Sequence, residues 1–321
     1  MRYADLCIPV LTDDEIRHEL DPTRLLAALE TAFRDRYPSV IIQPRLQIPT
    51  PGGTFLIMSC SDPTTGALGM KLITVRGAPP PGEPRVLATY VLLDPATSCP
   101  TATFPANAIT ELRTAATSAL ATKFLARQDA ATLGIFGTGR QARAHLALMP
   151  LVRDFRRVVV CGSNPDSTRT FANRMSGELK LPVEPLEAAT CAAVSDVLCT
   201  CTTSSTPLFD GTRLRPGMHL NLVGTFQTHC REVDSVTIER SRVVVDTYEG
   251  ALAEAGDLLI PLAQHVITRD HILADLHQLV SQQKTVRRDA DDITLFKSVG
   301  CALEDLVAAE LLHVNPPGSP P

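Results

Sequence analysis

Short apolar runs alternate with helical patterns through the second half of the chain. Five runs are typical of strands: ATLGIF, RRVVVCG, DVLCTCT, MHLNLVG and SRVVVD. The segment GTGRQARAHLALM follows the first run and DSTRTFANRM follows the second, and both are typical of helices. Strands that alternate with helices predict a doubly wound parallel sheet covered on both faces. After Gly256 the pattern predicts a polar helical stretch, and ITLFKSVGCALEDLVAAELL predicts a strand or loop followed by a helix.

The first half of the chain has a different pattern. Asp21 and Pro22 are typical of a helix N-cap followed by proline at the first helical position. The apolar residues that follow share one helix face: Leu25, Leu26, Leu29 and Phe33. From about Pro44 onward, β-rich runs at 55 to 58, 70 to 75 and 86 to 93 are broken by Pro-Gly clusters and predict an antiparallel sheet. Residues 107 to 127 lack glycine and proline and predict one long helix.

Composition narrows the class of protein. The net charge of -5 comes from interspersed acids and bases without a basic face, so we predict no nucleic-acid partner. No run of about 18 residues is free of charged and polar breaks, and the start lacks a basic region followed by an apolar one. We therefore expect a soluble cytoplasmic protein that neither spans nor binds a membrane. Nine cysteines without a C-x-x-C pair and eight histidines without H-E-x-x-H predict reduced thiols and no metal.

The most specific motif is a glycine-rich turn that follows an apolar strand and opens a helix. It matches G-x-G-x-x-A, in which the first glycine allows the tight turn, the second lets the backbone approach a pyrophosphate, and the alanine keeps the helix close to its strand. The amides and dipole of the helix N-terminus then face the anion. The pattern predicts a dinucleotide site of the Rossmann type at Gly137, Thr138, Gly139, Arg140, Gln141 and Ala142.

The end of the second predicted strand bears on the choice of dinucleotide. NAD sites usually place an acid there for the ribose hydroxyls, whereas this chain has Ser163 and Asn164, with Arg169 further on. Without that carboxylate a 2′-phosphate is not repelled, so the sequence favours NADPH; NADH stays open because Asp166 lies nearby. Three hydroxyl residues follow another strand and either contact the cofactor or cap a turn: Thr200, Thr202 and Ser204.

Several segments together resemble the ornithine cyclodeaminase/mu-crystallin family over nearly the whole chain. They are LIMS, GMKL, ITELRTAATSALATKFLAR, GTGRQA, DVLCTCTTSSTP, LVG with REVD, EAGDL and ITLFKSVGCALEDL. The resemblance implies an NAD(P)-binding Rossmann domain, 128–299. It also implies an α+β substrate and dimerisation domain formed by the N-terminal region and C-terminal helix, 1–127 with 300–321, and a homodimer. It further places Thr114, Val223, Gly224, Thr225, Ser298 and Val299 near cofactor or substrate.

Three cations are the candidate substrate ligands. In the family, cations at the positions of Arg45, Lys71 and Arg113 hold the substrate carboxylate beside the nicotinamide. The residues themselves agree, because a cation such as Lys71 within an apolar run is unfavourable unless an anion meets it. A snorkelling lysine and surface arginines in ion pairs are the alternatives. Glu232 and Asp246 match family positions and are typical of acids that accept backbone N–H bonds.

The residues after Gly224 indicate which of the family's activities this chain has, cyclodeamination or imine reduction. Cyclodeaminases of the family carry a proton-transferring aspartate where this chain has Phe226, and phenylalanine cannot move a proton. Reduction of a preformed cyclic imine requires only that the enzyme orient the imine and deliver a hydride to it. Phe226 would form an apolar wall against the ring. We therefore expect reduction of Δ1-pyrroline-2-carboxylate or Δ1-piperideine-2-carboxylate to proline or pipecolate, with Lys71 and Arg113 as the catalytic pair. His229 is a candidate proton donor, although an exposed loop histidine is the simpler interpretation.

Two other functions stay open. A cyclodeaminase or amino acid dehydrogenase would act on an open-chain substrate, against which Phe226 weighs. The mu-crystallin branch of the family binds thyroid hormone in an NADPH-dependent way. The second open function is therefore that of a small-ligand binding protein. Retention of all three cations favours turnover.

Overall fold

The two halves of the hydrophobic pattern form two different sheets. The structure is a computed structural model that describes residues 11–80, 83–97 and 99–314. It divides into two compact units, one taking in the chain up to Arg113 and from Cys301 on, the other Thr114–Gly300. The division falls inside one long helix, α3 (Ala106–Leu125), so the domain boundary predicted at residue 127 stays a prediction.

The first unit contains the predicted antiparallel sheet. Its strands pair in the order β1-β3-β4-β5-β6, with β2 on β3. The bounds of its elements are α1 (Asp13–Glu19), α2 (Pro22–Thr31), β1 (Ile41–Ile42), β2 (Leu46–Thr50), β3 (Gly53–Asp62), β4 (Ala67–Arg76), β5 (Val86–Leu93), β6 (Pro100–Pro105) and α11 (Ala302–Val314). β6 was not predicted, because prolines at both of its ends argue against a strand.

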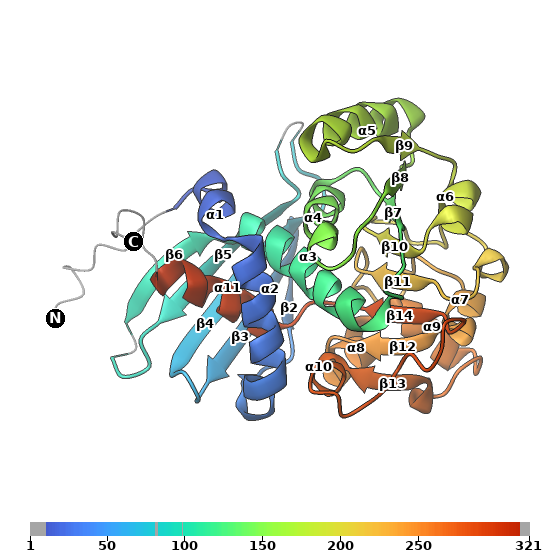
Figure 1. Ribbon diagram of the computed structural model, residues 1–321. Helices are drawn as coiled ribbons and strands as arrows, with labels where there is room; N and C mark the ends of the chain where they lie inside the picture. Colours follow the sequence, from blue (N-terminus) through green and yellow to red (C-terminus); the bar gives the residue numbers. More distant parts are fainter. Residues whose placement is uncertain (1–10, 81–82, 98, 315–321) are drawn as a thin grey trace. The chain divides into compact units, whose positions relative to one another are not determined.

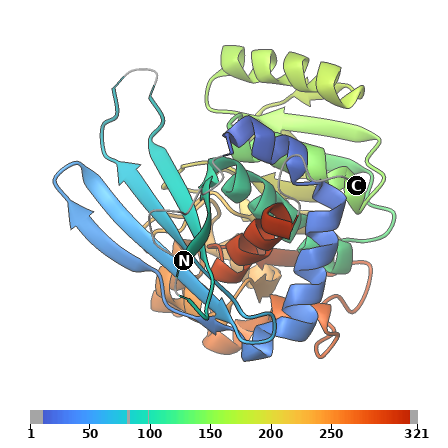
Figure 2. The same ribbon diagram turned by 90° about the vertical axis from the view of Figure 1, so that its left-hand side faces the viewer.

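Alternation along the strands decides which face of this sheet is buried. In β3 and β4 every second residue is buried, as a sheet covered on one face requires. Helix α11 packs on β3, β4 and β5 and against α2; Figure 2 shows the red and dark blue helices beside the blue strands. As predicted, Asp21 caps α2 by accepting the Arg24 N–H, and Pro22 begins the helix.

The second unit is a parallel sheet of eight strands in the order β13-β12-β14-β11-β10-β7-β8-β9 (Figure 1). The chain runs from β7 outward to β9 and returns to the other side of β7 with β10, so the strand order reverses between β7 and β10. A Rossmann fold binds its ligand at the carboxyl edge of such a point. The strand bounds are β7 (Thr132–Phe136), β8 (Arg157–Cys161), β9 (Val183–Pro185), β10 (Val197–Thr200), β11 (His219–Leu222), β12 (Arg242–Val245), β13 (Ile272–Asp275) and β14 (Thr294–Lys297).

Helices connect these strands, and the central strands are buried along almost their whole length. The helix bounds are α4 (Arg140–Leu148), α5 (Pro165–Leu179), α6 (Ala188–Val194), α7 (Ser235–Arg240), α8 (Tyr248–Glu254), α9 (Gly256–Ala263) and α10 (Leu276–Val280). The helix predicted after Gly256 is present, but its predicted polar character is wrong: α9 is largely apolar, and the strand β13, which was not predicted, follows it. In the described part of the chain, no helix has the length and apolar character needed to cross a membrane.

Two buried histidines make the second unit sensitive to acid. Burial lowers the pKa of His145 from 6.5 to about 4; burial and the Arg287 charge lower that of His219 to about 3. His145 lies within hydrogen-bond distance of Ser118 Oγ (3.0 Å). Since both are neutral when folded and take up protons when unfolded, stability is lost as pH falls from 6.5 toward 4.

We expect the free energy of unfolding to fall by several kcal/mol, roughly 2–3 per histidine, between pH 7 and 4.5. Urea unfolding at both pH values measures the loss. His219→Asn should reduce this pH dependence, whereas the same change at the exposed His229 should leave it as in the unmodified protein. An equal pH dependence in all three proteins would contradict the assignment.

Candidate active site

The turn between β7 and α4 has the geometry that its glycines predicted. Gly137 has φ +110°, and a Cβ there would lie 2.5 Å from the Cys201 carbonyl oxygen. Around Gly139 a Cβ would meet nothing within 4 Å, so the backbone before α4 faces open space. Ala142 is fully buried on the helix. Open backbone at a helix N-terminus suits the pyrophosphate of a dinucleotide.

A buried glutamate joins the loops that follow β10 and β11. Glu232 accepts hydrogen bonds from Thr200 Oγ1 (2.7 Å), from Thr202 N and Oγ1 (2.9 and 2.7 Å) and from Gly224 N (2.8 Å). Burial raises its pKa, although the Lys297 charge lowers it in part. Thr202 Oγ1 also accepts the Ser204 N–H. The three predicted hydroxyl residues therefore brace the carboxyl edge of the sheet, and Glu232 is the structural acid that the sequence predicted.

A buried ion pair supports the loop that carries Phe226. Lys297 Nζ lies 2.9 Å from Asp257 Oδ2 and donates to the Thr225 carbonyl oxygen at 2.7 Å, and both charged side chains are fully buried. Thr225 Oγ1 donates to the same carboxylate (3.1 Å). Phe226 is half-buried against the core of this unit. Sequence reasoning missed both charged residues, although a lysine within the apolar run ITLFKSVG was a signal of the same kind as Lys71.

Asp246 holds the segment after β14. Its Oδ2 accepts hydrogen bonds from Ser298 Oγ (3.1 Å), Val299 N (2.7 Å) and Gly300 N (2.6 Å). The carboxylate thus fixes the two predicted site residues Ser298 and Val299 at the carboxyl ends of β12 and β14, in agreement with the structural role predicted for it.

The residues predicted to determine the preference for NADPH or NADH follow the end of β8. Asn164 caps α5 by accepting the N–H groups of Asp166 and Ser167 (2.9 and 3.0 Å). Arg169 pairs with Asp166 one helical turn on, and both side chains are exposed. A Cβ on Gly162 would lie 2.9 Å from Thr138 Cγ2, so this loop adjoins the glycine-rich turn. Ser163, which stands between Gly162 and Asn164 in the chain, is exposed.

The predicted cations form a cluster within the first unit. Lys71 on β4 is 1% exposed, and its Nζ donates to Asp305 Oδ1 (2.8 Å) and Thr110 Oγ1 (3.3 Å). Arg113 donates from Nε to the same Asp305 oxygen (3.0 Å) and from Nη1 to Glu304. Sequence reasoning missed both acids of α11, because a single sequence does not show which side chains lie opposite β4.

Electrostatics tie Arg45 to this cluster. Burial, the Arg113 charge and, to a smaller extent, the Arg45 charge lower the pKa of Lys71 to about 8, while Asp305 acts in the opposite direction. Burial alone would lower the pKa of Arg113, but Asp305 and Glu304 raise it. The structure therefore brings the three predicted cations into one electrostatic group of the first unit.

The other predicted residues lie in the second unit. Thr114 is buried on α3 and Val223 half-buried after β11. At the start of α4, Arg140 is exposed and Gln141 half-buried, its carbonyl oxygen 2.8 Å from His145 Nδ1. No cluster of metal-ligating side chains is found in the described residues.

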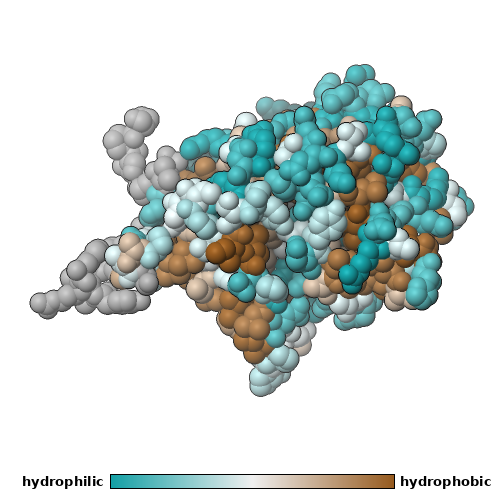
Figure 3. Space-filling view, turned by 90° about the horizontal axis from the view of Figure 1, so that it is seen from below, coloured by the Kyte–Doolittle hydropathy of each residue, from teal (hydrophilic) through white to brown (hydrophobic). Residues whose placement is uncertain are grey.

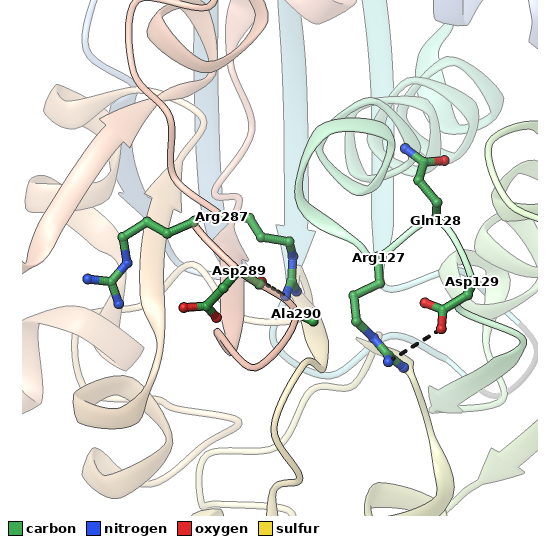
Figure 4. Close-up of a pocket in the computed structure, with 7 residues that line it drawn as sticks. Arg127, Gln128, Asp129, Arg287, Asp289 and Ala290 are labelled. Atoms are coloured by element: carbon green, nitrogen blue, oxygen red, sulfur yellow. Dashed lines mark hydrogen bonds and ion pairs between the residues drawn. The ribbon is translucent and has the colours of Figure 1, made fainter.

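A surface pocket lies elsewhere in the second unit (Figure 4). It is lined by Arg127, Gln128, Asp129, Arg287, Arg288, Asp289 and Ala290. These residues precede β7 and β14, so the pocket lies at the amino ends of the parallel strands. A doubly wound sheet binds its cofactor at the opposite edge, and the pocket is therefore no part of the candidate site.

Comparison with known proteins agrees with this geometry. The Rossmann fold with its glycine-rich turn, together with relatives that are named as reductases, defines a nicotinamide-dinucleotide oxidoreductase. The chain belongs to the ornithine cyclodeaminase/mu-crystallin family, whose profile matches residues 9–317.

Individual relatives share much of the chain. It is 36% identical to the Delta(1)-pyrroline-2-carboxylate reductase of Colwellia psychrerythraea over 70% of its own length and 72% of the relative's. It is 33% identical to the ketimine reductase mu-crystallin of Rattus norvegicus, covering 94% and 96%. The structure of Thermococcus litoralis Delta(1)-pyrroline-2-carboxylate reductase in complex with NADH and L-proline has a TM-score of 0.91 and 35% identity, covering 95% of this chain and 96% of the other.

Proposed function

We propose that this enzyme reduces Δ1-pyrroline-2-carboxylate or Δ1-piperideine-2-carboxylate to proline or pipecolate. The observation that carries the proposal is the buried pair Lys71 and Arg113, two cations joined at one carboxylate oxygen. Together with Arg45 they bind the substrate carboxylate through charge-assisted hydrogen bonds. Relatives at 33–36% identity are named as reductases of this kind of substrate.

The remaining substrate contacts are apolar. Phe226 and Val299 form the wall against the ring carbons, and neither can transfer a proton. Because the cyclic imine arrives as the iminium, the residues need only bind and orient it. A bound nicotinamide supplies the hydride from C4. In this proposal Lys71 and Arg113 are the catalytic residues, since they hold the reacting ring in place.

The cofactor lies along the carboxyl edge of the parallel sheet in this proposal. The glycine-rich turn and α4 hold the pyrophosphate, and the loops braced by Glu232 and Asp246 hold the ribose and nicotinamide. The cofactor-binding residues are Thr114, Gly137, Thr138, Gly139, Arg140, Gln141, Ala142, Ser163, Asn164, Arg169, Thr200, Thr202, Ser204, Val223, Gly224, Thr225 and Ser298.

Steady-state oxidation of NADPH and NADH against a panel of cyclic imines tests the function. We expect turnover of Δ1-pyrroline-2-carboxylate, Δ1-piperideine-2-carboxylate or both. Ammonia release from ornithine or lysine with NAD⁺ would instead show a cyclodeaminase or dehydrogenase. Tight cofactor binding without turnover of any imine would show a small-ligand binding protein.

NADPH is the preferred cofactor in this proposal, with NADH as a weaker one. The end of β8 carries no acid at residues 161–164, and Asp166 is ion-paired with Arg169. We expect Arg169→Gln to lower kcat/KM for NADPH about tenfold, the value of one charged contact, with little change for NADH. Asp166→Asn frees Arg169 and should raise the NADPH preference. Equal ratios in all three proteins would contradict the assignment.

The protein is a homodimer in this proposal, paired through the outer face of the antiparallel sheet. Hydrophobic side chains reach the surface in several patches (Figure 3), and four on this face are 40–55% exposed: Ile41, Leu46, Ile48 and Leu87. Exposed apolar side chains that share one face of a sheet favour an interface there. The first unit is thus the dimerisation and substrate domain, the second the cofactor domain.

We expect Leu46→Asp to convert the dimer to monomers in sedimentation velocity, because it places a charge in an apolar interface. Leu151→Asp makes the same change at a residue that is 42% exposed in the second unit and should leave the dimer intact. A monomeric unmodified protein would refute the proposal.

The cytoplasm is the proposed location. The eight cysteines in the described part of the chain are free thiols, and most of them are buried. Free thiols persist in reducing compartments.

A further inference from the structure

One carboxylate oxygen joins the two buried cations of the first unit. Asp305 Oδ1 accepts from Lys71 Nζ at 2.8 Å and from Arg113 Nε at 3.0 Å, and the Asp305 side chain is fully buried. The two cations come from different elements, β4 and α3, and would repel each other if nothing lay between them. Asp305 Oδ2 has no hydrogen-bond partner among the described residues.

We propose that Asp305 is a positioning residue, which holds Lys71 charged and fixes it together with Arg113 in the arrangement that receives the substrate carboxylate. The inference rests on the proposed function and extends it to α11. An ammonium group has three N–H donors, and Asp305 and Thr110 take two of those on Lys71. The third is the donor to the substrate.

Among the groups around Lys71, the Asp305 carboxylate has the largest effect in keeping the lysine charged. On α3 lie Thr110 and Arg113, on α11 Asp305 with Glu304 next to it, and on β5 the buried Tyr90 is its cross-strand neighbour. Arg45 adds a further positive charge. Glu304 bonds to Arg113. Asp305 is thus the anion that bonds directly to the ammonium group. Burial and the neighbouring cations already lower the Lys71 pKa to about 8, and loss of Asp305 would lower it further.

Titration of the Lys71 side chain tests the proposal without reference to turnover. The chain has five lysines, so lysine labelled with ¹³C at Cε gives five NMR resonances, and Lys71→Met identifies one. In Asp305→Asn we expect the Lys71 midpoint to fall by at least about one pH unit. The alkaline limb of kcat/KM for Δ1-pyrroline-2-carboxylate should move by the same amount, since kcat/KM reports groups of the free enzyme.

Glu310→Gln is the matched control, because it removes a carboxylate from the same helix that pairs with Arg36. It should shift neither readout. A Lys71 midpoint unchanged in Asp305→Asn would overturn the positioning role whether or not the enzyme turns over imines. A shifted midpoint in a protein that reduces no imine would sink the proposed function and leave the role of Asp305 standing.

Asp305→Glu carries the test if the asparagine variant does not fold. It keeps the charge and moves it by one methylene, so Lys71 should still titrate near its original midpoint while KM for the imine rises about tenfold. An unchanged KM would show that the position of the carboxylate is irrelevant and would overturn the proposal.

Discussion

We expect Lys71→Met to abolish detectable imine reduction, with kcat/KM lower by at least about a thousandfold. Methionine has nearly the length of the lysine side chain but carries neither charge nor donor. Arg113, which shares the Asp305 Oδ1 oxygen with Lys71, would then have to hold the proposed substrate carboxylate without Lys71. Steady-state kinetics with Δ1-pyrroline-2-carboxylate measure the loss. Fluorescence titration of NADPH measures cofactor affinity, which we expect to change little.

Lys284→Met is the control for this change, because Lys284 is exposed in a loop of the second unit. It should retain the original rate. If Lys71→Met reduced imines at that rate, the lysine would be only structural, and the carboxylate would have to bind elsewhere. A loss of NADPH affinity equal to the loss in rate would point to damage beyond the substrate cluster.

Local sequence signals were sufficient for most of the fold. The glycine-rich turn, the apolar runs of the parallel sheet and the N-cap at Asp21 each depend on neighbouring residues, and each is confirmed. The prediction failed at short edge strands. β9 has three residues, too few for a periodic pattern. β13 is as long as the predicted strands β10 to β12 but lies at the sheet edge, where it pairs with β12 alone among the described strands.

The candidate site divides in a similar way. Lys71 could be noticed because a charge within an apolar run needs a partner, but the sequence does not say that the partner is Asp305, 234 positions away. The same holds for Lys297 and Asp257. A strand pattern shows which face of β4 is buried, whereas the identity of what covers that face comes from the tertiary fold. Sequence reasoning therefore found Lys71 and Arg113 but missed the acids that pair with them, and it missed both members of the Lys297–Asp257 pair.

Gly139→Ala should weaken NADPH binding on the order of tenfold or more and leave the free energy of unfolding nearly unchanged. A Cβ at Gly139 meets no protein atom within 4 Å, so the folded chain accepts it. The methyl group would instead occupy the space where the proposed pyrophosphate approaches the backbone. NADPH titration and urea unfolding of the same samples separate the two effects.

Gly137→Ala should instead lower both the NADPH affinity and the free energy of unfolding. Its φ of +110° disfavours any side chain, and the new Cβ would lie 2.5 Å from a backbone oxygen of Cys201, so we expect about 1–3 kcal/mol less stability. Gly177→Ala, in the last turn of α5 where a Cβ would meet nothing within 4 Å, should gain about 0.5–1 kcal/mol and keep full affinity. Normal NADPH affinity in Gly139→Ala would place the cofactor away from this turn. Because the two glycines are two residues apart, only their opposite surroundings, one filled by protein and one open, can make them respond differently.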